Sequence, residues 1–208
     1  MPIPISGQVG EQVVSKGVTS QPLRQGGLAD MIVSQCSGRY YEMARNQRVF
    51  CAQAIVTAPV IYSTAAGTGG PLLWNGTSTV VGVILAVGIG VTVVSTVAAA
   101  LGITGNTGQT AAPGTTTAID GQRCTYLGGP LPAINAYRIG TPTVAGNFLL
   151  PIAQLHTGAL TVDNVGMGWA DIGGAVIVPP GCWASIAASA TATTTVAQLG
   201  LMWAEVPV

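Results

Sequence analysis

Charged side chains are scarce in this sequence. Its 208 residues include seven Lys and Arg against seven Asp and Glu, so the formal net charge is zero. Not one charged side chain occurs between Arg48 and Asp120. Such sparse and balanced charges form no basic footprint for nucleic acid, and we expect no nucleic-acid partner. They also favour association, which would cover apolar faces that an isolated subunit exposes.

Residues that commonly perform catalysis or bind metals are also few. His156 is the single histidine, and no nucleophile motif such as GxSxG accompanies it. Asp163 and Asp171 flank Met167-Gly168-Trp169, where a carboxylate in a Gly-rich loop typically caps a turn. His, Cys and acidic residues do not cluster at the spacings of metal ligands. We therefore predict no enzyme, no metal site and no cofactor.

The cysteines indicate a cytoplasmic site of synthesis. They are Cys36, Cys51, Cys124 and Cys182. They contain no CxxC pair, and three disulfide pairings stay open, but buried free thiols are favoured. The N-terminal sequence MPIPISGQVGEQ lacks the charged region and apolar core of a secretory signal.

The most apolar segment is Val80–Ile103, which is long and neutral enough for a membrane helix. Its pattern favours strands instead. From Val81 to Val93 the odd positions are large and apolar, while the even ones include Gly82, Ala86, Gly88, Gly90 and Thr92. A period of two places the bulky set on one face of a strand. No Lys or Arg anchors either end, so we expect one buried strand or a strand pair and no membrane partner.

Composition divides the chain near residue 48, because eight of the fourteen charged residues precede residue 50. We predict an extended arm and boundary segment over residues 1–48, with a short helix near Leu28–Gln35, and a β-sandwich over residues 49–208. The arm is too polar and glycine-rich to form a core, but its scattered apolar residues would gain by docking on a partner. These candidate partner-binding residues are Val13, Val14, Leu23, Leu28, Met31 and Ile32.

Turn residues punctuate the rest of the chain, which has 29 glycines and 13 prolines in all. Asn75-Gly76 and Pro179-Pro180-Gly181 are typical turns, and Thr104–Thr117 is expected to be a loop. Short strands between turns indicate an all-β, antiparallel sandwich or jelly roll. Besides the long run, strands are predicted at Val49–Thr57, Val60–Ser63, Leu72–Trp74, Arg123–Leu127, Tyr137–Ile139, Asn147–Gln154, Ala159–Val162, Ala175–Val178, Trp183–Ala188 and Val196–Val206.

Four stretches of the chain resemble a group of small structural proteins of tailed bacteriophages. They are Gly38-Arg39-Tyr40-Tyr41-Glu42 leading into Val49-Phe50, Leu73-Trp74-Asn75, Val178-Pro179-Pro180-Gly181, and Met202-Trp203-Ala204-Glu205-Val206-Pro207. The relatives carry a second acidic residue where this chain has Ala204. The resemblance implies a jelly-roll virion component, a homotrimer that decorates or cements the capsid exterior by bridging subunits of the major capsid protein.

A second hypothesis assigns the same fold to a tail-fibre or head-fibre module that binds host glycans. Tyr126, Tyr137 and Trp169 are its candidate contact residues. The loops are mostly Gly, Thr and Ala, which favours the structural role. Of the four tryptophans, Trp74, Trp169, Trp183 and Trp203, most are expected to pack in the core or in an interface.

Overall fold

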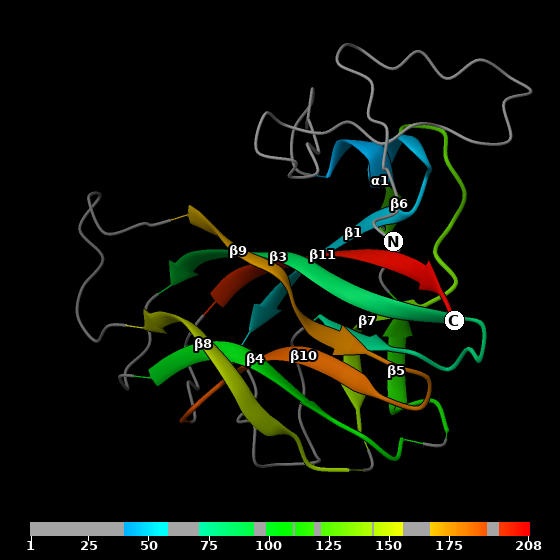
Figure 1. Cartoon of the computed structure of the whole chain (residues 1–208). Helices are drawn as coiled ribbons and strands as arrows, with labels where there is room; N and C mark the ends of the chain where they lie inside the picture. Colours follow the sequence, from blue (N-terminus) through cyan, green and yellow to red (C-terminus); the bar gives the residue numbers. More distant parts are fainter. Residues whose placement is uncertain are drawn as a thin grey trace, which may run out of the picture. The chain divides into compact units, whose positions relative to one another are not determined.

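The computed structural model describes residues 40–57, 71–93, 99–109, 111–118, 122–142, 144–155, 167–190 and 196–208. By their contacts, residues 42–208 form one compact unit. The described residues contain eleven strands and one short helix, α1 (Tyr41–Arg45). The strands form two antiparallel sheets (Figure 1). The all-β prediction is confirmed, whereas residues 1–39 of the predicted arm and boundary segment, strands Val60–Ser63 and Ala159–Val162, and helix Leu28–Gln35 lie outside the described residues.

The first sheet has five strands in the order β6-β1-β11-β3-β9. Their bounds are β6 (Arg123–Cys124), β1 (Val49–Thr57), β11 (Val196–Pro207), β3 (Val80–Val93) and β9 (Met167–Val178). The second sheet has six strands in the order β5-β7-β2-β10-β4-β8. Their bounds are β5 (Gly114–Ala118), β7 (Asn135–Thr141), β2 (Leu72–Trp74), β10 (Trp183–Ala188), β4 (Ala99–Asn106) and β8 (Asn147–Leu155).

The uncharged run Val80–Ile103 forms parts of two strands, as its alternation predicts. β3 lies in the first sheet between β11 and β9, and β4 lies in the second between β10 and β8. Both strands are therefore central in their sheets, and β-branched residues suit such positions. Among the described residues, no helix combines the length and the hydropathy needed to cross a membrane.

The expectation that all odd positions of β3 share one face is wrong. The register between β3 and β11 shifts at Leu85, because Met202 pairs with Ala86 and the next residue, Trp203, pairs with Ile84. Before this irregularity Ile84 belongs to the core, and after it Val87 and Ile89 do. A bulge inserts an extra residue and exchanges the faces of the strand. The core face thus changes from even to odd positions at Leu85.

The expected loop Thr104–Thr117 is also only partly correct, because β4 continues to Asn106 and β5 begins at Gly114. The glycines of β4 resemble turn signals in the sequence, but they make room for neighbours. A Cβ atom on Gly102 would collide with the ring of Phe148, and one on Gly105 would lie 2.7 Å from the carbonyl oxygen of Trp183. Glycine within a strand often marks such close packing.

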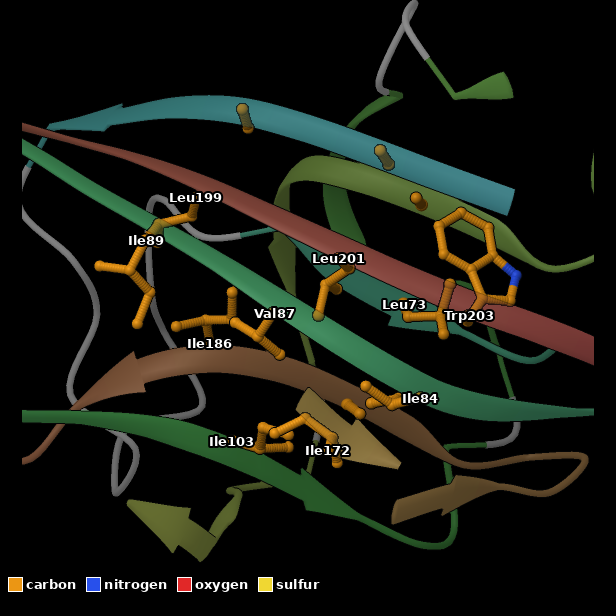
Figure 2. Packing of buried hydrophobic residues seen from close by; sticks show 14 of the residues in the cluster. Leu73, Ile84, Val87, Ile89, Ile103, Ile172, Ile186, Leu199, Leu201 and Trp203 are labelled. Carbon is orange, nitrogen blue, oxygen red and sulfur yellow. The ribbon is translucent and has the colours of Figure 1, made fainter. Parts of the chain in front are cut away.

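The hydrophobic core lies between the two sheets and is built mainly from aliphatic side chains. Trp203 from β11 is its largest fully buried side chain, and its ring centroid lies 6.0 Å from that of Phe50. Figure 2 shows core side chains from both sheets pointing into the space between the sheets. Those labelled are Leu73, Ile84, Val87, Ile89, Ile103, Ile172, Ile186, Leu199, Leu201 and Trp203.

Candidate functional site

Most of the candidate site residues predicted from the sequence lie outside the described residues. The arm residues Val13, Val14, Leu23, Leu28, Met31 and Ile32 lie outside the described residues, as do His156 and Asp163. Asp171 is exposed on β9, paired in register with Ala86. The expectation that Asp171 lies in a loop is therefore wrong. β9 extends through this glycine-rich segment, where Gly173 and Gly174 adopt positive φ values of 62° and 84°.

The three candidate glycan-binding aromatic residues have different environments. Tyr126 lies in the turn after β6 and is 49% exposed. Tyr137 is buried on β7 beside Leu72 and Trp183, so its assignment to a binding loop is wrong. Burial also raises the pKa of the Tyr137 hydroxyl above its ordinary value. Trp169 is 58% exposed, but it lies on a strand instead of in a loop.

The other tryptophans pack inside the protein, as expected for most of them. Trp203 and Trp183 are buried, and Trp74 is partly buried against the small cluster that contains Trp183. The indole N–H of Trp74 donates a hydrogen bond of 3.3 Å to the carbonyl oxygen of Gln109. Trp169 is therefore the only one of the four with most of its surface exposed.

Trp169 occupies one end of a row that crosses four strands of the first sheet. Gln53 on β1 pairs with Gly200 on β11, Gly200 pairs with Gly88 on β3, and Gly88 pairs with Trp169 on β9. A Cβ atom on Gly88 would lie 3.2 Å from Cε2 and Cζ2 of the indole, and one on Gly200 would lie 3.7 Å from Cη2. The ring therefore lies over both glycines and points along the row toward Gln53.

Two side-chain amides lie at the far end of this row. Nε2 of Gln198 donates a hydrogen bond of 3.0 Å to Oε1 of Gln53. Gln53 is exposed, Gln198 is partly exposed, and Gln198 pairs in register with Gly90. An amide has one carbonyl oxygen and two N–H donors. After their mutual bond, the pair keeps donors and an acceptor for another polar group.

Glu205, near the end of β11, is a buried carboxylate whose role sequence analysis missed. Its oxygens accept hydrogen bonds from the backbone N–H groups of Ala133 at 3.0 Å and Ile134 at 2.8 Å. The indole N–H of Trp203 also approaches it at 3.5 Å. The alternation along β11 could have indicated this burial, because Leu199, Leu201 and Trp203 are on the core face and position 205 continues their pattern. A charge at such a position needs polar partners.

Asn75 is a second buried polar residue, and its side chain joins three segments. Nδ2 donates to the carbonyl oxygens of Val80 at 2.8 Å and Val178 at 2.9 Å. Oδ1 accepts from the backbone N–H of Thr77 at 3.1 Å and from its hydroxyl at 2.7 Å. Although Asn75-Gly76-Thr77 matches a glycosylation acceptor, both N–H groups of the amide are used in the fold. Asn75 is a structural residue of this turn.

The described cysteines, Cys51, Cys124 and Cys182, are free thiols. Burial raises the pKa of Cys182, and burial together with the nearby Cys124 raises the pKa of Cys51. A raised pKa keeps a thiol protonated and unreactive. Within the described ranges, no three His, Cys, Asp or Glu residues gather into a group that could hold a metal ion.

Comparison with known proteins gives no relative: no family model, curated protein or solved structure matches this chain.

Proposed function

We propose that the two sheets form a jelly roll with an inserted segment. A jelly roll is an antiparallel ribbon of strands rolled so that the first strand pairs with the last and the second with the last but one. When β5, β6 and β7 are set aside, the remaining strands pair in this way. The pairs are β1 with β11, β2 with β10, β3 with β9, and β4 with β8.

The inserted segment between β4 and β8 extends both sheets on the same side. β6 adds to β1 at the edge of the first sheet, while β7 and β5 add to β2 at the edge of the second. Glu205 binds the link between β6 and β7 through the N–H groups of Ala133 and Ile134. Because Ile134 is itself in the core, this contact supports the insertion as part of the folded domain.

We propose that the protein is a structural component of a tailed-phage virion. It decorates or cements the capsid exterior as a homotrimer bound to the major capsid protein, without catalysis. The observation that carries this proposal is the set of apolar side chains exposed in a chain with few charges. Burying exposed apolar surface against a partner is favourable and drives most protein–protein association. The side chains are Ile55 (66%), Leu127 (92%), Leu131 (66%), Leu149 (51%) and Ile177 (56%).

These apolar groups occupy several elements, which suits contacts with more than one neighbour. Ile55 lies on β1 and Ile177 on β9 in the first sheet, and Leu149 lies on β8 in the second. Leu127 and Leu131 lie in the link between β6 and β7. A cement protein needs one surface for its own copies and another for the coat. Jelly rolls are used in many viral capsid proteins, which supports the assignment by fold analogy.

Binding to capsids tests the proposal. The full-length protein is mixed with capsids of the encoding phage that lack it, and the mixture is sedimented. We expect co-sedimentation and an increase in the temperature at which the capsids release DNA. The variant Leu127→Ser should bind less without loss of folding stability, since this side chain is already in solvent, whereas exposed Ser78→Ala should bind normally. Failure of the full-length protein to co-sediment would contradict the proposal.

A further inference from the structure

The exposed surface of Trp169 is a flat ring face. One face of the indole lies on Gly88 and Gly200, so the exposed 58% of the residue belongs mainly to the opposite face and the ring edge. Large aromatic side chains at protein–protein interfaces usually project and fill a pocket of the partner. Trp169 instead lies flat along its own sheet. Its geometry suits a ligand that is itself flat and apolar on one side.

Polar side chains lie beside the indole ring, and the neighbouring strands carry glycines instead of bulky side chains. Gly88, Gly200 and Gly90 form a floor without side chains across β3 and β11. Gln53 and Gln198 lie at the far end of the Trp169 row, with amide groups left for further hydrogen bonds. A Cβ on Gly200 would lie 3.4 Å from Cγ of Gln53 and 3.7 Å from the indole, so both side chains border the same glycine.

We propose that Trp169, Gln53 and Gln198 form a saccharide-binding site on the outer face of the first sheet. A pyranose with equatorial hydroxyls presents axial C–H groups on its faces and hydroxyls around its rim. Its C–H face would stack on the indole, as positively polarised hydrogens do on the negative face of an aromatic ring. Its rim hydroxyls would exchange hydrogen bonds with the two amides, which both donate and accept.

The preferred ligand is a neutral β-linked glucose or N-acetylglucosamine unit. Its equatorial substituents leave axial C–H groups free on both faces, whereas an axial hydroxyl would block stacking on the face from which it projects. The exposed carboxylate of Asp171 follows Trp169 by two residues on β9 and disfavours an anionic sugar. The saccharide site does not depend on the proposed capsid attachment. Sugar binding and co-sedimentation with capsids are measured independently, and either can fail alone.

Fluorescence titration of the full-length protein with cellotetraose and chitotetraose tests the site. Trp169 is the most exposed tryptophan, so its emission should change on binding, with a Kd on the order of 1 mM. Saturation-transfer NMR should place the strongest contacts on the C–H groups of one sugar face. Trp169→Ala should weaken binding at least about tenfold, and Gln53→Ala should weaken it less. Sialyllactose should bind more weakly than either neutral sugar.

Two controls separate the site from general effects on folding or assembly. Tyr126→Ala removes another exposed aromatic residue and should leave binding unchanged. Circular dichroism and sedimentation velocity should show that Trp169→Ala keeps the fold and the oligomeric state. Absence of binding to both neutral sugars at millimolar concentration, or equal binding by Trp169→Ala, would overturn the proposal. A Trp169→Ala variant that dissociates, with no sugar binding by the parent, would also overturn it and assign this face to contact between copies.

Discussion

The carboxylate of Glu205 accepts a hydrogen bond of 2.8 Å from the backbone N–H of Ile134, 71 residues earlier in the chain. It also accepts one from Ala133, so a single side chain satisfies two neighbouring backbone donors. These bonds attach the link between β6 and β7 to β11. They make Glu205 one of the residues that hold the inserted segment against the first sheet, together with Thr125, which donates to the carbonyl oxygen of Val49.

Replacing Glu205 with Gln should destabilise the fold. A Gln side chain has the same shape but one acceptor oxygen, so one of the two backbone donors loses its partner. Hydrogen bonds to charged groups contribute about 1.5–3 kcal/mol each. We expect a decrease of this size in the free energy of unfolding, measured by urea denaturation. The neighbouring exposed change Val206→Thr should alter it by less than about 0.5 kcal/mol, and equal effects would contradict the role of Glu205.

Core and surface aliphatic residues on the first sheet should respond differently to truncation. Leu201 on β11 is buried at 1% exposure, while Ile177 on β9 is 56% exposed. Leu201→Ala should lower the free energy of unfolding by about 2–5 kcal/mol, because it removes buried methyl groups and leaves a cavity. Ile177→Ala should lower it by less than about 1 kcal/mol. Thermal unfolding followed by circular dichroism measures both, and a large loss for Ile177→Ala would place this residue in the core instead of on the surface.

Cys51 and Cys182 should react slowly with iodoacetamide in the native protein. Burial raises the pKa of each above the ordinary value of 9.0, so the reactive thiolate is scarcer in the folded state than in the unfolded state. The folded state favours the protonated thiols, so their contribution to stability is present below pH 9.0 and is lost as pH rises through the raised values. Peptide mass mapping after a short reaction at pH 8, with and without urea, measures the protection. Equal labelling in both conditions would show that these thiols are accessible.

Deleting residues 1–37 should separate assembly from attachment. The first described strand begins at Val49, and the core cluster lies entirely within the unit 42–208. We expect the truncated protein to stay trimeric in analytical ultracentrifugation but to lose co-sedimentation with capsids, because the apolar arm residues would be absent. Monomers would contradict a trimer formed by the sandwich. Undiminished capsid binding would contradict the assignment of the arm.

The sequence predicts a strand correctly where a run of alternating or apolar residues ends at strong turn residues. Strong turn residues fix the bounds of β2 and β10, since Asn75 closes one and Pro179-Pro180-Gly181 precedes the other. Gly181 has a φ of 72° there, and the N–H of Cys182 donates to the carbonyl oxygen of Pro179 at 3.1 Å. The bulge at Leu85 was not predictable, because alternation alone does not locate an inserted residue.

Most features that the sequence did not predict depend on contacts between strands that are far apart in the chain. In the sequence Gly102 resembles a turn residue, but in the fold it makes room for the ring of Phe148. The glycines near the start of β9 resemble a loop in the sequence, so the first part of this strand was not predicted. Trp169 was a candidate by its residue type alone. Its flat position depends on Gly88 and Gly200, which reach it through two different strand pairings. The partners of Glu205 are likewise set by the fold and not by nearby sequence.

Electron cryo-microscopy of intact virions tests the central proposal most directly. We expect trimeric density on the capsid exterior into which the two antiparallel sheets, of five and six strands, fit without rearrangement. We also expect contact between this density and the major capsid protein. Density for this chain in the tail or its fibres, or its absence from purified virions, would contradict a capsid cement role.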